Sequence, residues 1–195
     1  MRRRRTAHER RATTETTVTI TLSLDGGRRT VRTSLPFFDH MLELLAFHAG
    51  FGLSVRASGD TAVDEHHLVE DVGLVLGTAF SRALGDRRGI ARYGSVMTPM
   101  DESLSYVAVD ISGRPHLSYD VRFAPSYRRE CFDLSVLREF FQAFVNAARV
   151  TLHVKMLARG NNHHVAESVF KGVGRALGTA VAVVRRGVRS SKGVL

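Results

Sequence analysis

Four stretches of the chain carry apolar side chains at the three- and four-residue spacing of an amphipathic helix. They cover residues 37–49, a run that begins near His66, residues 134–148 and a run that begins near His163. Side chains at this spacing lie on one face, which a globular protein buries. In the two runs that begin at histidines, the expected buried residues are Val69, Val72, Leu76, Ala79, Phe80 and Ala83, and Val169, Phe170, Val173, Leu177 and Val181.

Between these helices the pattern changes to the two-residue alternation of strands. Residues 13–22 alternate and are rich in β-branched side chains, which favours a strand. The turn Asp25-Gly26-Gly27 follows, so residues 29–34 are expected to return as the hairpin partner of that strand. Further predicted strands cover residues 53–57, 95–112, 115–123 and 151–156.

The order of the predicted elements repeats along the chain. Each half contains strands, a helix, a short strand, a turn and a helix that opens with two adjacent histidines. When the halves are aligned, Glu139 falls opposite His40, because each precedes its short strand by the same interval. The sequence therefore predicts an α+β fold made by tandem duplication of a unit of about 90 residues. The expected divisions are a basic N-terminal arm at 1–10, half-repeats at 11–93 and 94–186, and a tail at 187–195.

Composition places the chain among globular proteins with a sizeable core. Hydrophobic residues occupy 44% and charged residues 24% of its 195 positions. The single cysteine, Cys131, excludes a disulfide framework and a cysteine-based zinc site. The basic start at Met1 is not followed by an apolar stretch, and no run is long enough to span a bilayer. We therefore expect a cytoplasmic protein with no membrane partner.

Positive charge is in excess, with a formal net charge of +9, and part of it lies at the two ends of the chain. Such an excess is compatible with nucleic acid, with an anionic or phosphorylated substrate, or with a basic proteome. The sequence has no basic stripe interleaved with aromatic residues and no known nucleic-acid-binding module. No nucleic-acid partner is therefore expected.

The two histidine pairs carry the strongest chemical signal. His66-His67 is followed by Glu70, and His163-His164 is followed by Glu167, so both windows read His-His-x-x-Glu. On a helix the carboxylate lies beside either imidazole, whereas adjacent imidazoles point about 100° apart and are expected to serve different ions. Imidazole and carboxylate together suit Zn, Mn, Fe or Ni. The second copy argues against histidines placed by chance at two solvated helix starts.

Adding His40 and its counterpart Glu139 gives a predicted two-metal system. The eight candidate ligands are His40, His66, His67, Glu70, Glu139, His163, His164 and Glu167. Four ligands to each six-coordinate ion would leave two positions open, which favours catalysis because structural sites are usually closed. Two alternatives could use the same ligands: a dinuclear hydrolase of phosphorylated substrates, and a non-enzymatic metal-buffering or nucleic-acid-binding protein.

A series of short motifs adds a family resemblance. In chain order they are Phe38-Asp39-His40-Met41-Leu42, Asp64-Glu65-His66-His67, Glu70-Asp71, Ile90-Ala91-Arg92-Tyr93-Gly94, Pro99-Met100-Asp101-Glu102, Asp110-Ile111-Ser112-Gly113-Arg114-Pro115, Thr151-Leu152-His153, Asn161-x-His163-His164, Phe170-Lys171 and Ser190-Ser191-Lys192-Gly193. From about Arg11 to the C-terminus this order resembles the imidazoleglycerol-phosphate dehydratase family. The resemblance implies dehydration of imidazole glycerol phosphate to imidazole acetol phosphate in histidine biosynthesis. It also implies a ribosomal-protein-S5-domain-2-like fold with helices between two sheets, two Mn²⁺ per site, and trimers assembled into a 24-subunit shell with sites between subunits.

The resemblance further implies roles for individual residues. One Mn²⁺ would be held by His40, His67, Glu70 and His163, and the other by His66, His164, Glu167 and Glu139, where the family more familiarly has His. Substrate contacts would come from Glu15, His48, Arg92, Arg114, Lys171, Ser190, Ser191 and Lys192, together with His40, His66, His67, Glu70 and His163. The cationic members and the serine hydroxyls suit a phosphate dianion. Glu15 is the first candidate for the acid/base group, with Glu70, Glu167 or a water in competition.

Overall fold

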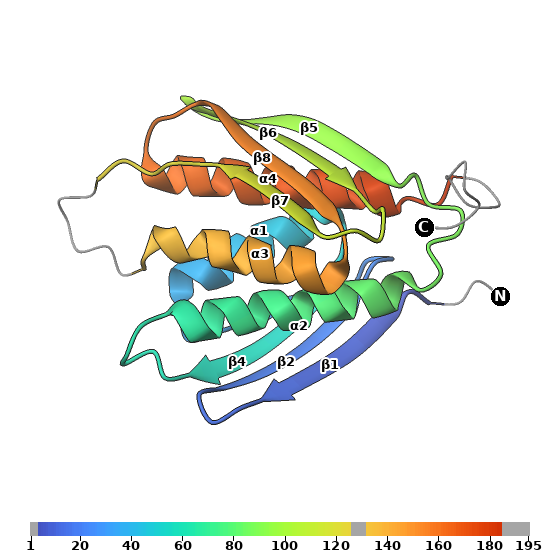
Figure 1. Cartoon of the computed structure of the whole chain (residues 1–195), viewed down its shortest axis with the longest axis horizontal. Coiled ribbons are helices and arrows are strands. Elements are labelled where there is room, and N and C mark those ends of the chain that lie inside the picture. The colour runs from blue at the N-terminus through green and yellow to red at the C-terminus, as the bar shows by residue number, and fades with distance from the viewer. Residues whose placement is uncertain (1–3, 126–131, 185–195) are drawn as a thin grey trace.

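Two four-stranded sheets enclose four helices in this protein (Figure 1). The computed structural model describes residues 4–125 and 132–184. The elements are β1 (Thr6–Ala12), β2 (Thr16–Ser23), β3 (Arg29–Arg32), α1 (Pro36–Ala49), β4 (Gly52–Gly59), α2 (His66–Leu84), β5 (Tyr93–Met100), β6 (Ser103–Asp110), β7 (His116–Asp120), the 3-10 helix η1 (Leu134–Val136), α3 (Leu137–Ala148), β8 (Thr151–Ala158) and α4 (Asn162–Val181).

The sheets confirm the internal duplication. The first has the strand order β1-β2-β4-β3 and the second β5-β6-β8-β7, so corresponding strands occupy corresponding places. In both sheets the last strand pairs in parallel with its neighbour, and the other pairs are antiparallel. Helices α1 and α2 cover the first sheet, while α3 and α4 cover the second. The predicted α+β fold with helices between two sheets is confirmed.

The core belongs to both halves at once. Phe140 of α3 packs edge to face on Phe38 of α1 at a centroid distance of 5.3 Å, and stacks on Phe170 of α4 at 5.7 Å. All three side chains are fully buried. Burying this much aromatic surface strongly stabilises the helix layer. The two half-repeats therefore fold as one integrated body.

Close helix packing fixes the direction of all four helices. A Cβ on Gly73 of α2 would lie 2.4 Å from the carbonyl oxygen of Phe140, and one on Gly77 would lie 2.5 Å from that of Phe144. Residue numbers rise together along α2 and α3, so the two helices run parallel. Helices α1 and α4 are parallel for the same reason, because Gly174 meets Leu45 and Gly178 meets Ala49. Phe38 near the start of α1 packs on Phe140 near the start of α3, so all four helices begin at the same end of the molecule (left in Figure 1).

Two strand predictions are wrong in detail. Strand β3 pairs in parallel with β4 and is not the hairpin partner of β2, because α1 separates the two strands that meet. The long strand expected at 95–112 is two strands, β5 and β6, which form a hairpin with a turn at Asp101. The positive φ of Asp101, 47°, reverses the chain there. Three consecutive polar residues, Asp101, Glu102 and Ser103, interrupt the apolar alternation at this turn and could have located it in the sequence.

The N-terminal segment also differs from the expected arm. Residues of the predicted arm form most of β1, an edge strand paired with β2 from Thr6 opposite Ser23 to Ala12 opposite Thr17. Its side chains are largely polar, so no alternation of apolar residues predicted a strand there. Ion pairs attach it to α2 instead: Arg11 Nε lies 2.9 Å from Asp71 Oδ1, and Arg82 Nη1 lies 2.6 Å from Glu9 Oε2. Part of the basic charge at this end is therefore structural.

Candidate active site

The two His-His helices start with the same local device. Oδ1 of Asp64 accepts a hydrogen bond from the backbone N–H of His66 at 2.9 Å, and Oδ1 of Asn161 accepts one from that of His163 at 2.8 Å. Such side chains satisfy backbone donors that a helix start leaves unpaired. Each histidine pair is therefore placed in the first turn of its helix.

Adjacent imidazoles point in different directions, as the sequence predicts. His66 lies nearest Glu70 and His67 nearest Asp60, while His163 contacts Glu167 and His164 contacts Glu102. Each pair therefore contributes its two rings to different surroundings.

The tightest cluster joins α1 to α4. Oε1 of Glu167 lies 3.0 Å from His40 Nε2 and 2.9 Å from His163 Nε2. Oε2 of the same carboxylate lies 2.5 Å from Lys171 Nζ. Among the described residues, His40, His163 and Glu167 form one of two groups whose ligand atoms lie within 4.8 Å of one another, as a metal ion requires.

The electrostatics of this cluster favour an ionised carboxylate. Glu167 is buried, and its burial alone would raise its pKa. Hydrogen bonds from Lys171, His40 and His163 outweigh burial and lower the pKa of Glu167 to about 2. Glu167 is therefore charged at neutral pH and available as a ligand.

His164 faces a second cluster at the β5–β6 turn. Its Nδ1 lies 3.0 and 3.1 Å from the two carboxylate oxygens of Glu102, and its Nε2 lies 3.9 Å from Asp101 Oδ2. These three residues form the other potential metal-binding group among the described residues. Hydrogen bonds from the backbone N–H of Asn161, from its own N–H and from His164 lower the pKa of Glu102 to about 2.

Helix α2 presents a third group of titratable side chains. His66 Nε2 lies 3.8 Å from Glu70 Oε2. His67 Nδ1 lies 3.2 Å from Asp60 Oδ2 and 3.7 Å from Glu15 Oε2. The hydrogen bond to Asp60, followed by the charge of Glu15, raises the pKa of His67. Glu15, the first candidate for the acid/base group, thus lies beside a candidate ligand.

All eight candidate ligands occupy the first two turns of their helices. Glu139 belongs to this set, in the first turn of α3, where its Oε1 accepts a hydrogen bond from Arg138 at 3.2 Å. Because the helices begin at one end, these side chains share that end of the molecule. Within the chain, however, Glu167 lies with His40 and His163, whereas the resemblance groups it with His164.

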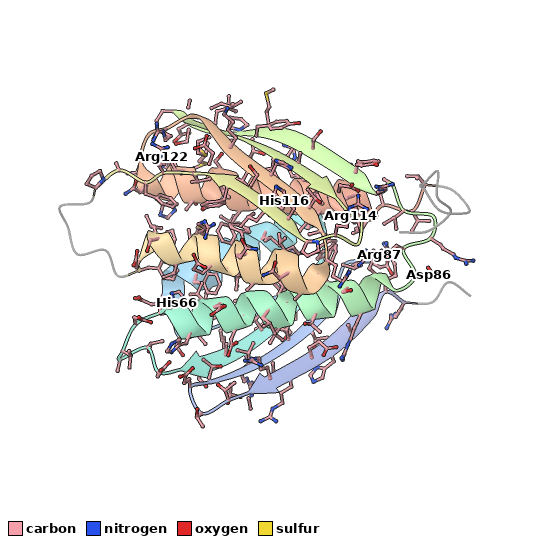
Figure 2. The ribbon with its side chains drawn as sticks, viewed as in Figure 1. His66, Asp86, Arg87, Arg114, His116 and Arg122 are labelled. Carbon is pink, nitrogen blue, oxygen red and sulfur yellow. The ribbon has the colours of Figure 1, made fainter. Side chains whose placement is uncertain are left out.

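The arginines expected to bind phosphate lie at the other end. The backbone N–H of Arg92 donates to the carbonyl of Ala180, near the end of α4, while His163 stands at its beginning. At 1.5 Å per residue those two levels are about 25 Å apart. Figure 2 shows Arg114 on the side opposite His66. One chain therefore does not bring Arg92 or Arg114 to its own candidate ligands.

The guanidinium of Arg92 is fixed by an ion pair and a ring contact. Its guanidinium donates to Asp110 Oδ1 at 2.8 Å and Oδ2 at 3.2 Å, and its Cζ lies 4.7 Å from the centre of the Tyr93 ring. These hydrogen bonds raise the pKa of Arg92. By contrast, Arg114 is exposed on the loop between β6 and β7.

The remaining predicted substrate residues divide into two sets. His48, in the last turn of α1, has its pKa lowered by burial and by the nearby charges of Lys171 and Arg175. This places His48 and Lys171 in one region between α1 and α4. Ser190, Ser191 and Lys192 lie outside the described residues.

Asp60 and Glu102 are partners of candidate ligands that the sequence interpretation did not single out. Asp60 directly follows β4 in the turn that leads to the first His-His helix. Glu102 belonged to a recognised motif, Pro99-Met100-Asp101-Glu102, but no spacing rule connects it to His164. Only the pairing of β5 and β6 beside α4 brings that carboxylate to the histidine.

Comparisons with known proteins agree with this architecture. The family profile described as imidazoleglycerol-phosphate dehydratase matches residues 33–177. The protein of that name from Xanthobacter autotrophicus is 56% identical over 174 residues, covering 89% of this chain and 88% of its own. That from Syntrophus aciditrophicus is 49% identical over 194 residues, covering 98% of both chains.

Two solved structures share the fold. The crystal structure of imidazoleglycerol-phosphate dehydratase from Staphylococcus aureus matches with a TM-score of 0.83 and 37% identity, covering 92% of this chain and 99% of that one. The enzyme from Pyrococcus furiosus, in complex with (S)-C348, matches with a TM-score of 0.84 and 37% identity, covering 96% and 100%.

The duplicated fold, the candidate metal-binding groups and these relatives define a hydro-lyase. The chain belongs to the imidazoleglycerol-phosphate dehydratase family. Membership confirms the predicted family, activity class and place in histidine biosynthesis. It favours neither the hydrolase nor the non-enzymatic alternative. None of the helices in residues 4–125 and 132–184 is long and apolar enough to cross a membrane.

Proposed function

We propose that the chain converts imidazole glycerol phosphate to imidazole acetol phosphate with two Mn²⁺ in each active site. The observation that carries this proposal is the gathering of imidazoles and carboxylates on the first turns of four helices that begin at one end. Mixed nitrogen and oxygen donors suit Mn²⁺ and related ions.

The residues present fit such ions. Within one chain the ligand atoms of His40, His163 and Glu167 lie within 4.8 Å of one another, although the resemblance assigns Glu167 to the other ion. The expected sets are His40, His67, Glu70 and His163 for one ion, and His66, His164, Glu167 and Glu139 for the other. When bound, the two ions would draw negative charge from the substrate's ring and so favour loss of the adjacent carbon-bound proton.

Glu15 is our first candidate for the group that moves the carbon-bound proton. Its exposed carboxylate is 3.7 Å from His67 Nδ1, so substrate bound beside His67 could reach it. Glu167 is a competitor, but the resemblance assigns it to a metal ion and its carboxylate is already paired with Lys171, His40 and His163. Glu70, 3.8 Å from His66, is the remaining competitor and is expected to serve as a ligand.

Cationic side chains would hold the phosphate of the substrate. Lys171 stands beside Glu167, and the expected contacts from Arg92, Arg114, Lys192, Ser190 and Ser191 would add charge and hydroxyl donors. His48 would lie near Lys171 at the edge of the same site. Arg92 stands about 25 Å along α4 from His163, which supports sites assembled from more than one chain.

This separation accords with the expected assembly. We propose trimers joined into a 24-subunit shell, working in the cytoplasm with no nucleic-acid or membrane partner. In such a shell the helix starts of one chain and the arginines of another would complete each site.

The test is turnover by the purified full chain. Protein loaded with Mn²⁺ is incubated with imidazole glycerol phosphate, and imidazole acetol phosphate and bound Mn²⁺ per chain are measured together. The expected result is product formation with two Mn²⁺ per chain and loss of activity after chelation. A fully loaded protein that forms no product would overturn the proposal, and release of inorganic phosphate would support the hydrolase alternative.

A further inference from the structure

Two of the candidate ligands meet a carboxylate through the same ring nitrogen. His164 Nδ1 lies 3.0 Å from Glu102 Oε2, and His67 Nδ1 lies 3.2 Å from Asp60 Oδ2. His40 and His163 behave differently, since both direct Nε2 toward Glu167. We infer that Glu102 and Asp60 are positioning residues that hold His164 and His67 through Nδ1, leaving Nε2 of each ring for a metal ion. The assignment of Nε2 to a metal ion rests on the proposed function.

The chemistry of the pair decides where the ring proton lies. An ionised carboxylate only accepts hydrogen bonds, so Nδ1 of His164 must be the donor to Glu102. A neutral imidazole carries one ring proton, and Nε2 then retains its lone pair. A carboxylate on the far nitrogen also fixes the ring orientation and makes the free nitrogen a better ligand.

Glu102 is itself firmly placed. Its Oε1 accepts a hydrogen bond of 2.6 Å from the backbone N–H of Asn161, the residue that caps α4. A Cβ on Gly160 would lie 2.0 Å from Cγ of Glu102, so the carboxylate packs where only glycine leaves room. The β5–β6 turn, the cap of α4 and His164 are thereby connected through one side chain.

The same arrangement recurs in the other half. Asp60 directly follows β4, and it faces the second histidine of the α2 pair. The carboxylates come from different elements of the repeat, since Glu102 lies in a hairpin turn. The shared feature is therefore the Nδ1 contact itself, made to the second histidine of each pair.

One alternative gives Glu102 a different task. Asp101, Glu102 and His164 could together hold a cation, because their ligand atoms lie within 4.8 Å of one another. Against this, both oxygens of Glu102 already face Nδ1, and one also accepts the Asn161 N–H. Asp101 is much more exposed, and its nearest oxygen is 3.9 Å from Nε2. Glu102→Ala and Asp101→Asn separate the two possibilities.

The experiment reads the ring protons directly. Solid-state ¹⁵N NMR of the full chain with labelled histidine, prepared without added metal, reports which nitrogen of His164 is protonated. The His164→Gln variant identifies its signals among the nine histidines. We expect neutral His164 to be protonated on Nδ1, and Glu102→Ala to move the proton to Nε2. Glu102→Gln should preserve the Nδ1 form, because its amide oxygen still accepts from Nδ1 and Asn161.

Mn²⁺ affinity is measured on the same variants. Glu102→Ala should weaken binding about 10- to 100-fold, as loss of such carboxylate partners does elsewhere. Glu102→Gln should weaken it less, and Asp101→Asn should bind as the wild type does. An unchanged tautomer in Glu102→Ala, or equal losses in Asp101→Asn and Glu102→Ala, would overturn the inference. Mn²⁺ stoichiometry of the wild type judges the proposed function separately, since the tautomer is read without metal.

Discussion

Oε1 of Glu167 lies 3.0 Å from Nε2 of His40, although 127 residues separate the two in the chain. The contact exists because α1 and α4 run parallel in tight contact, with Gly174 against Leu45. It connects the first half-repeat to the second at the level of the candidate ligands.

Replacing Glu167 with Gln should strongly impair the enzyme. The amide removes the negative charge that Lys171, His40 and His163 surround. We expect fewer bound Mn²⁺ ions and a fall in kcat/KM of at least about 100-fold, which corresponds to about 3 kcal/mol of transition-state stabilisation. Glu43→Gln, an exposed change on α1, is the control and should retain activity. If Glu167→Gln had the kinetics of the wild type, Glu167 would have no role in metal binding or catalysis.

Mixed assemblies should recover activity that neither variant has alone. His164→Ala damages the helix-start end of a chain and Arg114→Ala its opposite end (Figure 2). If each site uses both ends from different chains, co-expression of the two variants regenerates some intact sites. Activity well above that of either variant alone is expected, measured on co-purified assemblies. Two His164 variants expressed together provide the control, and no recovery would place each site within one chain.

The imidazole of His67 should titrate above its ordinary pKa in protein without added metal. The hydrogen bond to Asp60 is the main cause, so Asp60→Asn should lower the pKa of His67 in an NMR titration. Because the folded-state pKa is raised, protonated His67 stabilises the fold below pH 6.5, and this contribution is lost as pH rises through the raised pKa. Metal affinity should change in the opposite sense and fall as pH is lowered through it. An unshifted His67 in Asp60→Asn would contradict the assignment.

Glu139→His is the informative exchange at the eighth candidate ligand. An imidazole is softer than a carboxylate, so the variant should bind Zn²⁺ or Ni²⁺ better relative to Mn²⁺. Competitive metal binding measures this preference. Arg138→His, on the neighbouring exposed position, controls for a histidine added to the same turn. Identical metal preference in both variants and the wild type would show that Glu139 holds no metal.

Gly73→Ala should destabilise the fold without touching the candidate ligands. The added Cβ would lie 2.4 Å from the carbonyl oxygen of Phe140, so α2 and α3 must move apart. We expect a loss of about 1–3 kcal/mol in the free energy of unfolding, measured by urea denaturation of the assembled protein. Thr78→Ala, half-exposed on the same helix, should change stability by less than about 0.5 kcal/mol. Equal stability of the two variants would argue against tight packing at Gly73.

Local sequence signals located much of the fold. Helical spacing revealed the four helices, because apolar side chains every three or four residues must share a buried face. Local signals could not reveal β1, because its side chains are largely polar. Backbone pairing to β2 and ion pairs such as Arg11–Asp71 hold this strand in place. Nor could they show that β3 pairs with β4, since strand pairing depends on the path of the chain after α1.

The sequence by itself determined the residue types of the site and its duplicated layout. The two His-His-x-x-Glu windows predict that adjacent imidazoles diverge at a helix start and that a carboxylate lies beside them, because successive residues of a helix are rotated by about 100°. Only the tertiary structure decided the partners: Glu167 joins His40, Glu102 holds His164, and Arg92 stands at the far end of α4. These contacts join segments distant in the chain, and their distances follow from how helices and sheets pack rather than from any spacing along the sequence.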